Sequence, residues 1–285
     1  MELIIILLLS TLATTKVTLQ TRFGKSYLST EADTAFFNAL VFLTATLLFL
    51  ADIFIASPQT WFFAFLFGAF TVGFQLLYTK ALSIGNVSMT VLMVNLSMLF
   101  PTLVSAIVYK EPIGLVKGVG IVLTVIAFLL STNFKSKKSI SGKWFLLASL
   151  ALLFNGCIGI SQKIFAESPY GHEKEAFVSI SYLLAFVITS IIILIYHGKK
   201  IKITTAKKLP VYIFSVLTGL VLGSFQWLNT YAITIIDGTL LFPSYSGGVI
   251  ILSTIVGFVL FKDKITKSQA ISILIGVIAV VLMNC

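Results

Sequence analysis

One apolar stretch of this chain occurs twice, and this duplication constrains the fold more than any other feature. The first copy is residues 109–130, YKEPIGLVKGVGIVLTVIAFLL, and the second is residues 261–282, FKDKITKSQAISILIGVIAVVL. The pairs that are identical at a constant offset of 152 residues are Lys110/Lys262, Ile113/Ile265, Ile121/Ile273, Val125/Val277, Ile126/Ile278, Ala127/Ala279 and Leu130/Leu282. Internal repetition of this kind indicates that the whole architecture is duplicated.

A second echo lies upstream of the first. Residues 74–82, FQLLYTKAL, match residues 225–233, FQWLNTYAI, at an offset of 151. We therefore expect two related halves, residues 1–134 and 143–285, joined by a basic linker at 135–142.

The composition excludes an ordinary soluble domain. Of the 285 residues, 58% are hydrophobic and only 11% are charged, and the mean hydropathy is +1.06. Apolar runs of about 20 residues, long enough to cross about 30 Å of hydrocarbon as helix, recur along the chain. The net charge of +10 comes from lysines in short loops, which points to membrane topology and not to nucleic acid. Cys157 and Cys285 form no disulfide framework or metal-binding spacing, and we expect no cofactor.

Ten membrane-spanning segments can be placed, five in each half. Their expected ranges are 3–21, 33–54, 60–82, 86–109, a fifth beginning near Pro112 and ending near Ser131, 144–166, 175–196, 209–233, 237–261 and 265–284. An odd number of spans makes the second half enter from the opposite side of the membrane. The predicted fold is therefore an all-α integral membrane protein of ten transmembrane helices, arranged as two inverted five-helix repeats.

Loop charges predict the orientation. Fourteen Lys or Arg residues lie in the loops after the first, fifth, seventh and ninth spans, against three on the opposite face. The positive-inside rule places the first set in the cytoplasm, so both termini should face outside.

With these features the chain resembles the drug/metabolite transporter superfamily, in particular its ten-helix EamA-like members. The resemblance rests on the hairpin Tyr109-Lys110-Glu111-Pro112, on Gly118 and Gly120 after it, and on the echo that contains Asp263 where the family typically has Glu. It implies that spans 1, 3, 4, 6, 8 and 9 line a central cavity while spans 5 and 10 support it. It also implies termini in the cytoplasm, which disagrees with the loop charges.

Polar residues inside spans are the candidate binding residues, because burying them in a bilayer is costly. The substrate-binding residues that we predict are Lys16, Gln75, Tyr78, Asn95, Lys163, Gln226, Trp227, Asn229 and Tyr245. Lys16 and Lys163 lie on corresponding spans and could instead snorkel to a headgroup. The glutamines and asparagines could bridge helices, and the aromatic residues could belong to an interfacial belt.

Glu111 and Asp263 stand at hairpin turns, where we expect them to cap helices or pair locally. No Asp or Glu falls in the middle of an expected span, whereas lysines lie within spans. This asymmetry favours a substrate that carries an anionic group, such as an amino-acid carboxylate or a phosphorylated or sugar-linked metabolite. It argues against the carboxylate-based exchange of protons for organic cations.

The leading function is secondary active transport of a small metabolite by alternating access through a central cavity between the repeats. No nucleotide-binding motif indicates direct use of ATP. The alternatives are an exporter of cationic or neutral drugs, a lipid-handling or regulatory membrane protein, and a membrane enzyme, for which no His/Asp/Glu cluster has metal or acid–base spacing. The expected partners are the small-molecule substrate, the lipid bilayer and a coupling ion or counter-substrate. The expected setting is a multi-pass monomer or homodimer in the plasma membrane.

Overall fold

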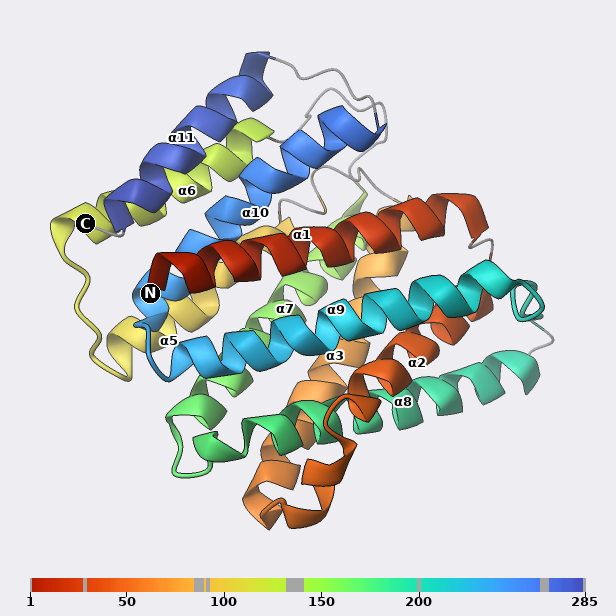
Figure 1. The fold of residues 1–285 in the computed structure, drawn as a ribbon. Helices are drawn as coiled ribbons and strands as arrows, with labels where there is room; N and C mark the ends of the chain where they lie inside the picture. The colour runs from red at the N-terminus through yellow and green to blue at the C-terminus, as the bar shows by residue number, and fades with distance from the viewer. Residues whose placement is uncertain are drawn as a thin grey trace. The chain divides into compact units, whose positions relative to one another are not determined.

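The structure of this chain is a computed structural model that describes residues 2–27, 30–84, 90, 93–131, 141–198, 201–261 and 267–283. Every regular element in these ranges is helical (Figure 1). The elements are α1 (Glu2–Tyr27), α2 (Glu31–Leu47), η1 (Leu50–Ile55), α3 (Pro58–Ile84), η2 (Leu96–Met98), α5 (Leu99–Ile107), α6 (Leu115–Ser131), α7 (Gly142–Glu167), η3 (Gly171–Glu173), α8 (Lys174–Gly198), α9 (Leu209–Ile233), α10 (Gly238–Phe261) and α11 (Lys267–Met283). The second hairpin with Asp263 and residues 135–140 of the basic linker lie outside the described residues.

Five stretches within the described helices are long and apolar enough to cross a membrane. They are Glu2–Gln20, Pro58–Ala81, Gly142–Glu167, Gly171–Gly198 and Leu209–Ile233. Shorter apolar helical segments occupy Met93–Ile107, Leu115–Leu130, Gly238–Ser253 and Ala270–Met283. The part of the chain that the structure describes is thus all-helical, with the apolar helices of a membrane protein. The expectation of ten crossings and an inverted repeat stays a prediction.

Several expected helix boundaries are wrong. The helix expected over 3–21 continues to Tyr27 as α1. The helix expected over 33–54 ends at Leu47, and a 3-10 turn follows, because Phe49 leaves the helical conformation with φ −130° and ψ 36°. The helix expected over 86–109 is interrupted by the 3-10 turn η2, which ends three residues before Pro101, and α5 ends at Ile107. Pro101 has no N–H to donate to the preceding turn. The next helix begins at Leu115 and not near Pro112, since Gly114 accepts its first hydrogen bond, from Gly118 at 2.9 Å.

The described residues form two compact units, and each draws on both halves of the sequence. The first unit consists of Met1–Thr11, Gly73–Ile164 and Ala232–Cys285, and the second of Leu12–Val72 and Phe165–Tyr231.

In the first unit, α6 packs along α11 (Figure 1). Their contact is close because small groups face each other: a Cβ on Gly120 would collide with Met283. Ser272 donates a hydrogen bond to the backbone oxygen of Ala127 at 2.7 Å and so ties the two helices together. The outer faces expose Leu115, Val119, Leu274 and Val281, a surface typical of helices that face lipid.

The pair Gly247-Gly248 allows α10 to pack closely against two neighbouring helices. A Cβ on Gly247 would lie 3.1 Å from Val280 of α11, and one on Gly248 would overlap Ser10 of α1. Ser10 Oγ in turn donates to the backbone oxygens of Ile6, at 2.8 Å, and Tyr245, at 3.1 Å. Small residues thus let three helices approach one another.

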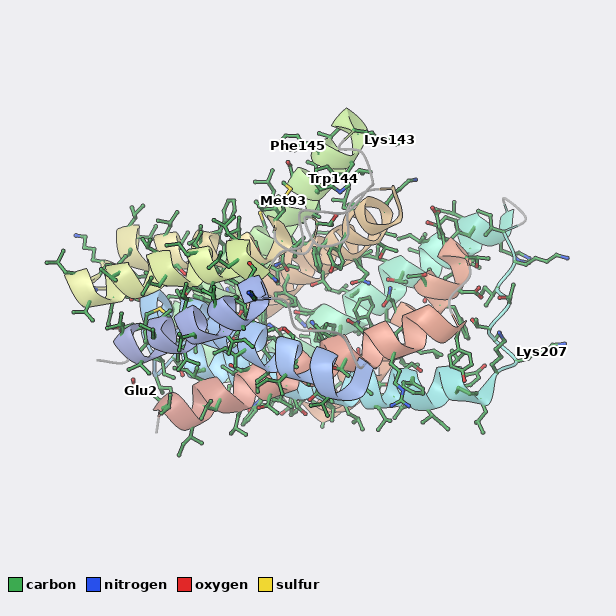
Figure 2. All side chains as sticks on the ribbon, turned by 90° about the horizontal axis from the view of Figure 1, so that it is seen from above. Glu2, Met93, Lys143, Trp144, Phe145 and Lys207 are labelled. Atoms are coloured by element: carbon green, nitrogen blue, oxygen red, sulfur yellow. The ribbon has the colours of Figure 1, made fainter. Side chains whose placement is uncertain are left out.

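The first turn of α7 is fixed in the same unit by Trp144, which is 1% exposed. Its indole Nε1–H donates to Thr90 Oγ1 at 2.9 Å, and Met93 packs against the small cluster that it forms with Ala81 and Ala148. Figure 2 shows Met93 and Trp144 side by side, with Lys143 and Phe145 at the same end of the helix. A buried indole needs such a partner for its N–H.

In the second unit, α2 packs along α8, and Ser179 of α8 donates to the backbone oxygen of Thr46 at 2.6 Å (Figure 1). Helix α2 begins with a capping box, in which Thr30 Oγ1 accepts from the N–H of Asp33 and Asp33 Oδ2 accepts from that of Thr30. The same carboxylate, fully buried, accepts the backbone N–H groups of Thr204 at 2.7 Å and Thr205 at 3.0 Å. Asp33 therefore fastens the loop before α9 to the start of α2.

Candidate functional site

The first unit contains a buried ion pair. Lys163, near the C-terminal end of α7, has a fully buried side chain, and its Nζ lies 2.5 Å from Oε1 of Glu111. The ammonium also lies 5.1 Å from the ring centroid of Tyr109. The interpretation that Lys163 snorkels to a headgroup is therefore wrong: its charge is balanced inside the protein, as burial of an ion requires.

Glu111 reaches this position from the hairpin that follows α5. The chain turns at Lys110, which has φ 56°, a left-handed conformation uncommon for a residue other than glycine. The N–H of Glu111 then donates to the backbone oxygen of Ser105 at 3.2 Å. Its Oε2 accepts the backbone N–H of Thr239 at 2.9 Å, in the first turn of α10. Glu111 thus caps a helix, as expected, but its charged partner is Lys163, 52 residues away, and not a local lysine.

The environment keeps this carboxylate ionised. Burial alone would raise the pKa of Glu111, but the hydrogen bonds from Lys163 and from the N–H of Thr239, with the positive charge of Lys163, outweigh it and lower the pKa below its ordinary value of 4.5. The Glu111 carboxylate is therefore ionised at neutral pH.

Two buried hydroxyl groups flank the ion pair. Ser105 Oγ and Thr239 Oγ1 are fully buried and have no hydrogen-bond partner among the described residues. Each belongs to a residue whose backbone bonds Glu111. Ser105 Oγ lies against Gly238, where a Cβ would collide with it. The groups around Glu111 are thus a cation, a helix N-terminus and two hydroxyls, all suited to an anion.

The other predicted binding residues of the first unit lie on α3, on α10 and beside η2. Gln75 and Tyr78 lie half-buried on α3, and the ring of Tyr78 stacks on Phe74 with centroids 5.3 Å apart. Tyr245 lies on α10 and meets the ring of Phe242 edge-on at 6.3 Å. Asn95 immediately precedes η2 and makes no side-chain cap.

Asn155 is a half-buried residue that the sequence analysis missed. From the middle of α7 its Nδ2 donates to Ser97 Oγ at 2.5 Å and to the backbone oxygen of Val94 at 3.4 Å. The criterion that selected Asn95, an amide in mid-span, would have selected Asn155 also. It joins α7 to the segment around η2. Among the described residues, no group of three or more His, Cys, Asp and Glu could hold a metal ion.

In the second unit, Lys16 of α1 lies over the ring of Phe225 on α9, with Nζ 5.9 Å from the centroid. No described carboxylate pairs with it. Asn229, which is 2% exposed, lies one turn beyond Phe225, so both residues share one face of α9. Gln226, 5% exposed, is their neighbour on the same helix.

Trp227 belongs to an aromatic group at the end of α9. Its ring stacks against those of Phe49, with centroids 6.4 Å apart, and Tyr231, with centroids 6.0 Å apart. The indole Nε1–H donates to Glu175 Oε1 at 2.7 Å, and Lys174 Nζ lies 5.9 Å from the ring of Tyr231. This part of the second unit therefore brings together an acidic group, a cation and stacked aromatic rings.

These features define an all-helical membrane protein with charged side chains buried among apolar helices. The model of the EamA-like transporter family matches residues 3–133, and this family is part of the drug/metabolite transporter superfamily. Over residues 3–133 the match agrees with the resemblance drawn from the sequence.

Two further comparisons identify a related protein and a structure of similar fold. A Haemophilus influenzae protein described as uncharacterized is 28% identical over 202 residues, which are 65% of this chain and 62% of the relative, so the match spans less than two thirds of that protein's length. A solved crystal structure, described only as that of a protein, is 14% identical and aligns over 97% of this chain and 98% of its own, with a TM-score of 0.75. This second likeness shows the fold alone.

Proposed function

We propose that the protein is a secondary active transporter that carries a small, anion-bearing metabolite across the plasma membrane by alternating access of two inverted five-helix repeats. The family match over residues 3–133 and the apolar helices support a transporter in a membrane. Ten crossings, a coupling ion or counter-substrate, and the direction of transport belong to this proposal.

The observation that carries the choice of substrate is Lys16. It is a lysine within an apolar helix that has no carboxylate partner among the described residues, with the buried amides of Gln226 and Asn229 on the helix that it contacts. An unpaired cation in such surroundings is costly, and a substrate anion would supply the missing counter-charge. Lys163 differs, because Glu111 already neutralises it.

One observation favours the alternative, an exporter of cationic or neutral drugs. Glu175 accepts from Trp227 within the stack of Phe49, Trp227 and Tyr231. Stacked rings beside a carboxylate suit an organic cation. On this alternative Glu175→Gln would abolish cation transport, whereas our proposal expects that variant to keep anion uptake.

Uptake into proteoliposomes tests the proposal. Purified protein should accumulate or exchange one amino acid or phosphorylated sugar from a metabolite panel, and should not do so with a quaternary ammonium ion. Turnover of a solute without its transport would select an enzyme instead and contradict the proposal.

A further inference from the structure

We propose that the groups around Glu111 form a carboxylate-binding subsite, which the chain's own Glu111 occupies in this structure. The subsite, which we call the carboxylate cradle, consists of Lys163 Nζ, the backbone N–H of Thr239 and the hydroxyls of Ser105 and Thr239. The inference rests on the proposed function and adds a second contact to it. Lys16 has no carboxylate partner among the described residues, whereas at Lys163 the chain's own Glu111 competes with the substrate's carboxylate.

The first argument is the chemistry of the donors. Lys163 supplies a charge-assisted hydrogen bond, and the N-terminus of the 24-residue helix α10 supplies an oriented N–H and the positive end of its dipole. One carboxylate oxygen is bound by each, Oε1 by Lys163 and Oε2 by Thr239. This two-point geometry fits a carboxylate and depends on no other part of the glutamate.

The second argument is independent of Glu111. Ser105 Oγ and Thr239 Oγ1 are buried hydroxyls that have no hydrogen-bond partner among the described residues, although a buried polar atom normally has one. A group bound to the cradle in place of Glu111 could accept from both. The unused hydroxyls indicate that the cradle offers more donors than the Glu111 carboxylate takes.

The third argument is the way Glu111 is attached. It sits in the irregular segment between α5 and α6, directly after Lys110 in its left-handed conformation, and its side chain is 10% exposed. Lys163, in contrast, is held within a long helix and fully buried. The cation is therefore the fixed member of the pair and the carboxylate the replaceable one. Asp237 adjoins α10 but pairs with Lys117 at 3.4 Å.

Exchange of Glu111 for a substrate carboxylate would free the hairpin from α10 while keeping Lys163 neutralised. No charge would be left unpaired inside the cradle at the end of the exchange, which avoids the large cost of a lone buried ion. Substrate binding would thereby be linked to the release of one helix N-terminus.

Chemical rescue tests the cradle without any transport assay. The full chain is purified as wild type, Glu111→Ala, Glu111→Gln and the double variant Glu111→Ala/Lys163→Met, and thermal unfolding is followed in sodium acetate and in sodium chloride of equal ionic strength. Acetate should raise the Tm of Glu111→Ala by about 2–4 °C more than chloride does, an increment that corresponds to about 1 kcal/mol. The wild type and the double variant should respond equally to both salts.

If Glu111→Ala does not fold, Glu111→Gln takes its place in the comparison. Its Tm should rise less in acetate, because the amide still binds Lys163, although weakly, and so competes with acetate. The proposal is overturned if neither single variant responds to acetate more than the wild type does, or if the double variant responds as strongly as Glu111→Ala. A larger effect of inorganic phosphate than of acetate would assign the cradle to phosphoryl groups and would likewise overturn it. Because uptake is not measured, failure here leaves the proposed transport to be judged separately.

Discussion

Glu111 Oε2 accepts the backbone N–H of Thr239 at 2.9 Å while its other oxygen binds Lys163, so one carboxylate joins the hairpin after α5 to α7 and to the start of α10. A charge that serves as ion-pair partner and as helix cap stabilises the fold in two ways. Its loss and the loss of Lys163 should therefore have different consequences.

Glu111→Gln should destabilise the protein more than Lys163→Met. It leaves a fully buried ammonium without its anion and weakens the cap of α10, whereas Lys163→Met leaves a carboxylate that is 10% exposed and still accepts from Thr239. Breaking a buried pair in this way should lower the free energy of unfolding by about 3–5 kcal/mol. Chemical unfolding in detergent measures this difference. Adding Lys163→Met to Glu111→Gln should recover part of the loss, and a double variant weaker than both single variants would contradict this account of the pair.

Acid should weaken the same contact. The pKa of Glu111 is lower in the folded state than its ordinary value of 4.5, so its stabilising contribution is complete above that value and is lost as the pH falls below it through the folded-state pKa. Glu111→Gln should flatten this part of the unfolding profile. Between about pH 5 and pH 8, where proteins are usually most stable, the free energies of unfolding of the wild type and Glu111→Gln should differ by a constant amount. A difference that grows towards alkaline pH would show that another group controls it.

Asp33→Asn should loosen the loop before α9. The carboxylate accepts from the N–H groups of Thr204 and Thr205 and from the capping box of α2, and weakening bonds to a charged acceptor should cost about 1.5–3 kcal/mol. Limited proteolysis should then cleave near residues 201–208 faster than in the wild type. Asp52→Asn, at a carboxylate in the first turn of η1, is the matched control and should leave this cleavage unchanged.

Gly248→Ala should destabilise the protein more than Gly247→Ala. The first change disturbs the packing of α1 on α10, and the second disturbs the packing of α11 on α10. The added methyl group at 248 would overlap Ser10, whereas at 247 it would lie 3.1 Å from a terminal methyl of Val280. Overpacking of this kind costs about 1–3 kcal/mol. Thermal unfolding should rank the variants in this order, and Gly248→Ala/Ser10→Gly should regain stability. Equal Tm values for the two alanine variants would contradict the ranking.

Much of the helical content could be predicted from the sequence, because a run of apolar residues long enough to span a bilayer has few other solutions. The expected range 209–233 coincides with α9, and the expected range 144–166 lies within α7. The break at Phe49 could not be predicted, since residues 48–55 are as apolar as a continuous helix would be.

Of the candidate site, the sequence indicated single residues but not their partners. Glu111 was recognised as a capping residue from its place at a hairpin, whereas its pairing with Lys163 depends on how α7 packs, which periodicity along one helix does not reveal. Asn155 met the mid-span criterion and was overlooked. The nine predicted binding residues remain predictions.

Counterflow of an anionic solute in proteoliposomes is the most direct test of the proposed carrier. Wild-type protein, Lys16→Met and, as a matched control, Lys143→Met at an exposed position in the first turn of α7 are compared with the anionic solute that the panel identifies and with a quaternary ammonium ion. The wild type and Lys143→Met should exchange the anion equally, and Lys16→Met should need roughly ten times more solute for the same rate, as expected for a lost charge-assisted contact. Normal anion exchange by a well-inserted Lys16→Met protein, or unchanged or improved transport of the cation by it, would contradict the account.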